Sequence, residues 1–474
     1  MYAKRLFLPP ICSHRVEDFL ESIIFPLHES GSLTILKILV QRNYACLLVS
    51  TSGATALLRY TPGEVSITSG SKQVLRSLHR LLLRKISELC RHSSSPELLL
   101  VFIGENPLPD AESKVAAALT RSGARAAIFS AFFIAFHWFL SSFARLDLAL
   151  GMLLSLVVTT LAAVALPPYL MLRALPRWRV PRGQMVRVYK AVLERLDDEV
   201  YTAALLAKAS ISKRRGAYLR PDEVRRVLEE WGVPVREVKL LEYDLYRMLG
   251  DGERAVLYIT PVPEVTALSL GFARRFSSIV LNAELLVDLE PDELSAVLEH
   301  ELEHLDRRDA VFLALMLVLG LVPLAFANPL AAHASALVAY LAAYAVFLML
   351  LSRAVEVRAD LAAAARKGAE PLKRAVVKLE YTELLRGTSL RSRVLSILSL
   401  SPQPPAWLRI AILEKHAGKR CSLLQALLAN VLALKLALEF DRRLITRTCP
   451  DSLTQEAGWR SVAALSSASY SRNT

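Results

Sequence analysis

Four long apolar runs constrain the fold of this chain more than any other feature of its sequence. They come as two pairs with short connections and occupy residues 126–143, 148–172, 311–327 and 331–351. A helix of about 20 apolar residues can cross a bilayer, and the mean hydropathy of +0.35 is high for a soluble protein. Buried helices of a large soluble core are the weaker alternative, because four such runs occur. The sequence therefore predicts four transmembrane helices, in hairpins over residues 126–172 and 311–351.

Basic residues lie at the outer ends of both predicted hairpins. They are Arg121, Arg125, Arg173, Arg177, Arg179, Arg182, Arg307, Arg308, Arg353 and Arg358. Because cytoplasmic flanks of membrane helices keep positive charge, both hairpins should enter from the cytoplasm. Much of the net charge of +13 is then membrane anchoring, and nucleic-acid binding loses most of its support. We expect a multi-pass protein of the cell membrane with the lipid bilayer as a partner.

The rest of the chain divides around the hairpins. Residues 1–120 alternate strand-like runs with glycine-containing turns, which predicts a small α+β domain of unknown role. Residues 173–310 and 352–420 should form the two parts of a mostly helical cytoplasmic domain, including helices over 180–201 and 220–232. Residues 421–474 are expected to be a helix and a disordered Ser-rich tail. The predicted fold class is a mainly α membrane protein with an extra N-terminal α+β domain.

The segment HELEH has the composition of a metal site. The five cysteines are scattered without a C-x-x-C pair, so neither a disulfide framework nor a thiolate site is indicated. His300 and His304 are four residues apart, which puts both imidazoles on one face of a helix. Imidazoles suit zinc, and Glu301 would be the general base that takes a proton from a water. A surface helix whose histidines pair with Glu301 and Glu303 is the alternative.

A third ligand is needed, and carboxylates are its best source. The remaining histidines lie in the N-terminal region, within the apolar runs or near the C-terminus. Glu356 and Asp360 lie just beyond the fourth run and are four residues apart. One carboxylate can bind the metal while the other hydrogen-bonds a ligand histidine. A solvated charge cluster beside the membrane is the alternative.

The order of these segments resembles the HtpX-like integral membrane zinc metallopeptidases and, more distantly, the CAAX prenyl proteases. The resemblance covers residues 256–413 and rests on VLEHELEHLDRRD, two apolar runs and SRAVEVRAD. It implies that one Zn²⁺ is bound by His300, His304 and Glu356. It further implies that Glu301 is catalytic and that Asp360 orients a ligand histidine. The implied function is a membrane-bound zinc endopeptidase, a hydrolase that acts on misfolded or damaged membrane proteins.

Two departures from the family pattern concern substrate contacts. The family's closing His-Pro-Pro reads QPPAWLRI here, so Gln403 replaces the histidine while Arg409 is kept. Thr266 stands where the family tends to have asparagine. Arg409 and Thr266 are therefore candidate oxyanion or substrate contacts, and residues 277–282 are a candidate strand that pairs with an extended substrate.

Two other functions stay open from the sequence. Prenyl-protein processing would want more spans than four, to enclose a lipid-sized chamber. A catalytically silent scaffold or sensor would keep zinc for structure alone, and it would not need Glu301. We expect membrane-protein or unfolded polypeptide substrates and no nucleic acid, whereas cleavage specificity and oligomeric state are not indicated.

Overall fold

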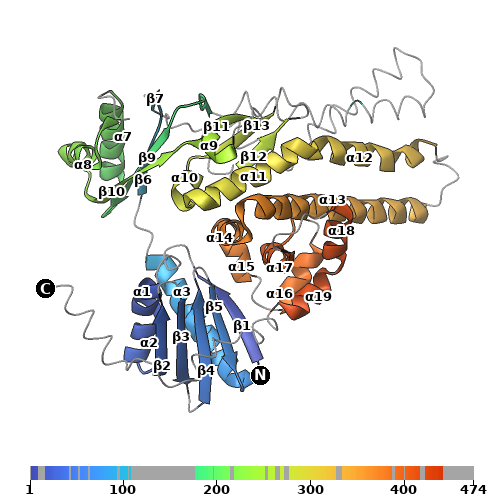
Figure 1. The fold of residues 1–474 in the computed structure, drawn as a ribbon, viewed down its shortest axis with the longest axis horizontal. Coiled ribbons are helices and arrows are strands. Elements are labelled where there is room, and N and C mark those ends of the chain that lie inside the picture. Colours follow the sequence, from blue (N-terminus) through green and yellow to red (C-terminus); the bar gives the residue numbers. More distant parts are fainter. Residues whose placement is uncertain are drawn as a thin grey trace.

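A computed structural model gives the fold (Figure 1). It describes residues 2–8, 16–41, 44–51, 54–61, 64–92, 97–104, 106–107, 158, 177–195, 197–213, 218–250, 255–261, 267–271, 277–326, 334–386, 390–399, 401–416 and 422–440. Among these residues the strands form three separate sheets. The chain is therefore a mixed protein, with more β structure than the expected mainly α fold.

The first sheet belongs to the N-terminal region. Its order is β1-β5-β4-β3-β2 and every neighbouring pair is antiparallel. The strands are β1 (Tyr2–Phe7), β2 (Thr34–Gln41), β3 (Tyr44–Thr51), β4 (Ala54–Thr61) and β5 (Glu64–Ser69). Three helices, α1 (Val16–Phe19), α2 (Phe25–Glu29) and α3 (Lys72–His92), share its apolar core. Cys46 on β3 is disulfide-bonded, so the expectation of cysteines without disulfides is wrong at that position.

The second sheet joins strands that are far apart in the sequence. Its order is β10-β9-β6-β7, from β6 (Glu97–Ile103), β7 (Asn106–Pro107), β9 (Val186–Leu193) and β10 (Val235–Tyr243). Helices α7 (Asp198–Lys213) and α8 (Pro221–Glu230) share its core. The predicted helix over residues 180–201 is wrong in its first half, because β9 is paired on both sides and this sheet pairing outweighs the helical pattern.

The third sheet borders the functional site. Its order is β12-β13-β11-β8, from β8 (Trp178–Arg179), β11 (Val256–Thr260), β12 (Ala267–Leu270) and β13 (Ser278–Asn282). Two short helices, α9 (Leu245–Leu249) and α10 (Leu285–Asp288), contribute to the same core. Residues 277–282 were the candidate substrate strand, but β13 is buried between two neighbours, so this expectation is wrong. The edge strands of this sheet, among the described residues, are β12 and β8.

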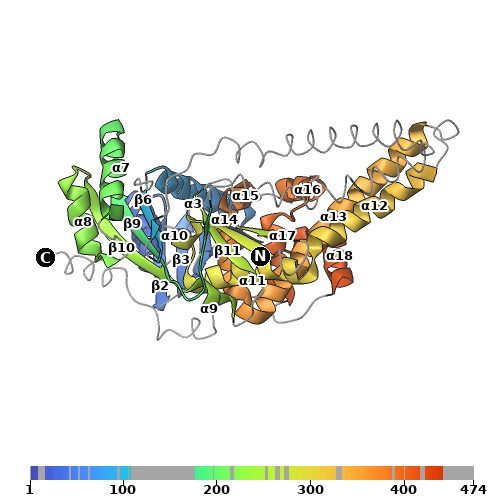
Figure 2. The same cartoon turned by 90° about the horizontal axis from the view of Figure 1, so that it is seen from above.

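Helices form the remainder of the described chain. They are α11 (Pro291–Arg307), α12 (Asp309–Phe326), α13 (Ala334–Lys367), α14 (Ala369–Leu379), α15 (Tyr381–Arg386), α16 (Leu390–Leu398), α17 (Ala406–His416), α18 (Leu423–Val431) and α19 (Ala433–Glu439). Figures 1 and 2 show α12 and α13 side by side, projecting together from the rest of the molecule. The other helices gather around the opposite end of α13.

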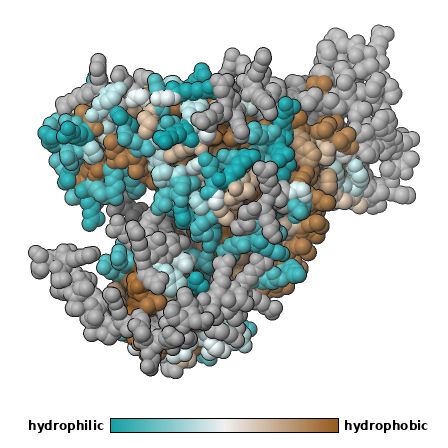
Figure 3. Space-filling model, viewed as in Figure 1, coloured by the Kyte–Doolittle hydropathy of each residue, from teal (hydrophilic) through white to brown (hydrophobic). Residues whose placement is uncertain are grey.

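The predicted membrane spans are tested only in part. The first hairpin, residues 126–172, lies outside the described residues, apart from position 158. Within the described part of the chain, the segment Ala339–Lys367 of α13 is long and apolar enough to cross a membrane, and Asp309–Gly320 of α12 is a shorter apolar helix. Large apolar side chains on this pair are exposed, with Leu315 and Leu319 at 52 % and Phe347 at 44 %. Figure 3 shows hydrophobic surface where the pair leaves the body.

A cluster of buried charges joins the N-terminal sheet to the helices. Arg5 on β1 pairs with Glu64 on β5 at 2.9 Å and with Glu414 on α17 at 3.0 Å. Lys373 on α14 pairs with the same two carboxylates at 3.2 and 3.3 Å. Phe7 on β1 joins the helical core beside these charges. Breaking one pair inside such a cluster leaves a buried charge without its partner, so the cluster fixes how β1 lies on α14 and α17.

Ion pairs hold α11 in place at both ends. Glu293, which is 0 % exposed, accepts from Arg374 at 2.9 Å and from Lys378 at 2.7 Å, both on α14. Near the other end, Arg366 on α13 pairs with Glu299 and with Glu303, the latter at 3.2 Å. Glu303, for which the sequence indicated no role, therefore ties α11 to α13. The helix that carries HELEH is therefore fixed against α13 and α14.

Replacing Glu293 by alanine should lower the free energy of unfolding by about 3 kcal/mol or more, because two cations lose a buried partner. Glu370→Ala is the matched control, since Glu370 on α14 is 61 % exposed and its ion pair with Lys373 is long, at 3.9 Å. Its effect should stay within about 0.5 kcal/mol. Urea unfolding of both variants in detergent measures the difference. Equal stabilities would contradict the importance of this ion pair.

Candidate metal centre

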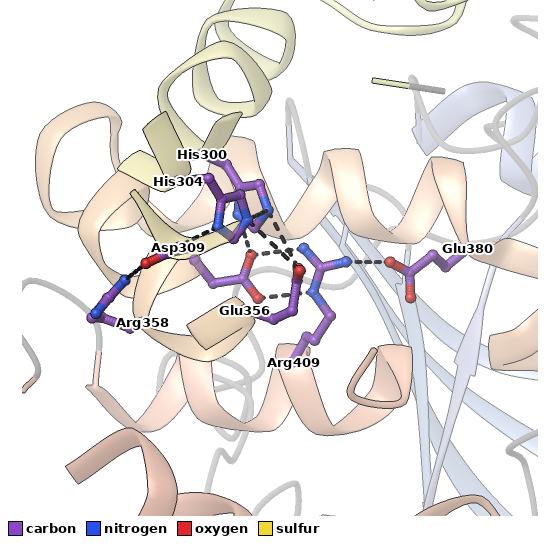
Figure 4. Close-up of polar contacts among 8 residues, drawn as sticks. His300, His304, Asp309, Glu356, Arg358, Glu380 and Arg409 are labelled. Carbon is purple, nitrogen blue, oxygen red and sulfur yellow. Dashed lines mark hydrogen bonds and ion pairs between the residues drawn. The ribbon is translucent and has the colours of Figure 1, made fainter. Parts of the chain in front are cut away.

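Three side chains from two helices converge on one point. Nε2 of His300 and Nε2 of His304, on α11, are 3.2 Å apart. The Glu356 carboxylate, on α13, lies 3.6 Å from Nε2 of His300 and 3.7 Å from Nε2 of His304. One ligand atom from each residue lies within 4.8 Å of the others, and Figure 4 shows the side chains facing one another. The structure thus brings together the three predicted ligands.

These distances fit a tetrahedral ion such as zinc. Two nitrogens at about 2.0–2.1 Å from zinc, with a tetrahedral angle between them, would be about 3.3 Å apart. The observed 3.2 Å between the two Nε2 atoms is close to that value. Two imidazoles and one carboxylate are also a donor set of catalytic zinc sites, which leave the fourth position to a water. The protein groups are therefore suited to hold zinc.

His300 is oriented from behind by Asp360 and Arg409. Nδ1 of His300 lies 3.0 Å from Oδ1 of Asp360, which leaves Nε2 facing Glu356 and His304. Arg409 on α17 donates to both oxygens of Asp360, from Nε at 2.8 Å and from Nη2 at 2.7 Å. Its third nitrogen, Nη1, donates to Glu380. Arg409 lines the cavity and is held by the carboxylates of Asp360 and Glu380, and its predicted contact with the substrate or oxyanion stays a prediction.

His304 is oriented in the same way by Asp309 and Arg358. Nδ1 of His304 is 2.8 Å from Oδ2 of Asp309, and Arg358 on α13 donates to the other oxygen of Asp309 (Figure 4). This contact depends on Arg308, which has a left-handed φ of 55° and ends α11 just before α12 begins at Asp309. Sequence reasoning missed the roles of Asp309 and Arg358, although both lie within the quoted segments VLEHELEHLDRRD and SRAVEVRAD. The left-handed conformation of Arg308 could not be predicted from the sequence, because arginine rarely adopts it.

Burial and charge act in opposite directions on His300. Burial disfavours its charged form, but Asp360 and Glu356 outweigh burial and raise the pKa of His300 to about 10. A cation that binds at Nε2 therefore competes with a proton. Burial also raises the pKa of Glu380 at the rim, against the opposing effect of Arg409.

A cavity of about 380 Å³ opens on this cluster. Glu301 lines it together with His300 and His304, so the predicted base faces the same space as the ligands. β12 lines it through Ala267, Leu268 and Ser269, and α14 also contributes to its wall. Gln403, which replaces the family's histidine, is also at the wall. Thr266 lies outside the described residues, so its predicted contact stays a prediction.

The comparisons with known proteins agree with this geometry. The model of peptidase family M48 matches residues 251–417, the range that holds both histidines, Glu301, Glu356 and their positioning residues. No curated protein matches the chain. The match to peptidase family M48 over residues 251–417 supports a metallopeptidase of that family.

Proposed function

We propose that this protein is a membrane-bound, zinc-dependent endopeptidase. The observation that carries the proposal is one cavity lined by His300, His304, Glu356 and Glu301, with an edge strand along its wall. When bound, zinc would polarise the substrate carbonyl and lower the pKa of a water. The protein groups that hold it would be His300, His304 and Glu356.

Glu301 is the general base of the proposed reaction. It lies on α11 between the two histidines and lines the cavity beside them. In the reaction it takes a proton from the attacking water and delivers a proton to the leaving nitrogen. No covalent bond to the protein forms. Asp360 and Asp309 hold the histidines with Nε2 toward the reacting centre throughout.

The substrate lies along β12 in an extended conformation. Among the described strands β12 ends its sheet, so within this part of the chain one side of its backbone is available for an added strand beside Glu301. Such pairing uses main-chain groups that every polypeptide has. It therefore favours unfolded segments of many sequences over a single folded partner.

The pair α12 and α13 anchors the peptidase in the membrane. Its exposed leucines and phenylalanine are costly in water and suited to lipid. With the arginines at the base of the pair, we propose a cytoplasmic orientation. A proteolytic cavity at the membrane surface suits quality control of unfolded or damaged membrane proteins.

Glu301→Gln should abolish casein cleavage while zinc binding is kept, because the amide cannot take a proton and Glu301 is not a ligand. We expect kcat to fall by about 100-fold or more. Asp306→Asn, an exposed change on the same helix, is the control and should cleave normally. Cleavage rates and bound zinc are measured on detergent-purified full-length protein. Undiminished cleavage by Glu301→Gln would exclude Glu301 as the base.

Asp309→Asn should weaken zinc binding by about 10–100-fold, because His304 loses the carboxylate that fixes its orientation. Asp292→Asn is the matched control, since Asp292 lies at the far end of α11 and is 50 % exposed. Zinc affinity is measured by competition with a chelator. Equal affinities in the two variants would show that Asp309 does not position the ligand.

Model peptides in which one amide near the cleavage site is an ester test the pairing with β12. Removing the N–H donor of a paired position should raise KM with little change in kcat, whereas the same change at an unpaired position should leave both constants unaltered. Steady-state kinetics with a series of single-ester peptides gives the pattern. A KM that is the same for every peptide would exclude strand pairing.

A further inference from the structure

The helices around the base of α13 expose a second apolar surface. It is formed by side chains of α16, α18 and α19, named here the leucine collar: Leu395, Leu398, Leu424, Leu428, Val431 and Leu434. Leu398 is 70 % exposed, Leu424 66 % and Val431 60 %. Large exposed apolar patches on a protein mark a surface that another apolar phase covers.

α18 buries an asparagine and exposes three large apolar side chains. Asn430 is buried, 4 % exposed, and its side-chain amide donates to the carbonyl of Ala426 at 2.9 Å. On the outer face lie Leu424, Leu428 and Val431. A helix that turns its amide inward and its leucines outward is adapted to an apolar surrounding.

The inner faces of these helices locate the collar at the membrane end of the body. Ala426, Leu436 and Ala437 share one core with Ala354 and Val357 of α13. Those two residues follow within six positions of Leu351, where the predicted fourth span ends. The outer faces of α18 and α19 therefore lie beside the point at which α13 would leave the bilayer.

The collar continues the hydrophobic surface of the projecting pair. Figure 1 shows α18 beside α13 and running across its direction, with α19 below it next to α16, and Figure 2 shows α16 near the same end of the body. In Figure 3 the hydrophobic surface extends from the base of α12 and α13 along the adjoining edge of the body. A helix that crosses the direction of a membrane span lies parallel to the membrane plane.

We infer that the leucine collar lies in the interfacial layer of the lipid bilayer, as a monotopic contact that α16, α18 and α19 add to the membrane spans. This inference rests on the proposed membrane insertion of α12 and α13. Interfacial helices bury their apolar face in the boundary between headgroups and acyl chains. The contact would hold the cavity of the peptidase close to the membrane surface.

Depth-dependent fluorescence quenching tests the inference. A bimane label is placed on single cysteines introduced by Leu428→Cys, Leu395→Cys, Phe347→Cys and Leu206→Cys, in full-length protein whose reactive native cysteines are replaced by serine. Leu206 on α7, 50 % exposed, is the matched control for an exposed leucine away from the collar. The proteins are reconstituted into phosphatidylcholine vesicles that carry a nitroxide either near the headgroup or deep in the acyl chain. Each labelled variant must keep the monodisperse gel-filtration profile of the parent.

The expected result is strong quenching of positions 428 and 395 by the shallow nitroxide, several-fold above that of position 206, and quenching of position 347 by the deep nitroxide. Quenching at 347 with none above the 206 level at 428 and 395 would overturn the inference and leave the proposed spans intact. Absence of quenching at 347 would instead overturn the membrane insertion on which the inference rests. Oxidative cross-linking of Leu428→Cys between copies, without quenching, would show that a second copy covers the collar and would also overturn it.

Discussion

Two histidines on one helix and a carboxylate on another can share a cation only while the two helices keep their register. In this protein α11 supplies the histidines and α13 supplies Glu356, and a shift of either helix by one residue would move a ligand atom by about 1.5 Å. Arg366 pairs with Glu299 and Glu303 across the same two helices. Arg358 reaches from α13 to Asp309 behind His304. The charges behind the cluster thus fix the same register that the metal requires.

Behind the wall of the cavity, α14 contacts the N-terminal sheet. On α14, Leu372 and Val376 line the cavity, while Lys373 faces the N-terminal sheet and joins the buried charges of Arg5, Glu64 and Glu414. Buried ion pairs add little net stability compared with apolar contacts, but they tolerate few alternative arrangements. Helix α14 therefore connects the N-terminal domain to the peptidase cavity, because one of its faces lines the cavity and another contacts the N-terminal sheet.

The sequence was sufficient for the three ligands and for Asp360 behind His300, and insufficient for Asp309 and Arg358 behind His304. The spacing of His300 and His304 fixes a shared helix face, and that local rule needs no tertiary information. The role of Asp309 could not be predicted, because its position depends on the left-handed conformation of Arg308, which arginine rarely adopts. The placement of β9 was missed because its helical pattern gave way to pairing with strands far away in the chain. The prediction that β13 pairs with a substrate was wrong because the sequence of one strand does not show its position within the sheet.

The pairing of β6 with β9 has a topological consequence. Ile103, the last residue of β6, is directly opposite Val186, the first residue of β9. The chain then turns into β7, which pairs with the same end of β6, leaves the sheet after Pro107 and returns to that end of the sheet at Val186. The first predicted hairpin lies in the interval between. Any excursion of that interval through a bilayer must then contain an even number of crossings. The contact between α11 and α13 imposes the same parity on the second predicted hairpin, so the β6–β9 pairing and the α11–α13 contact each require the two ends of one predicted hairpin to lie on the same side of a membrane.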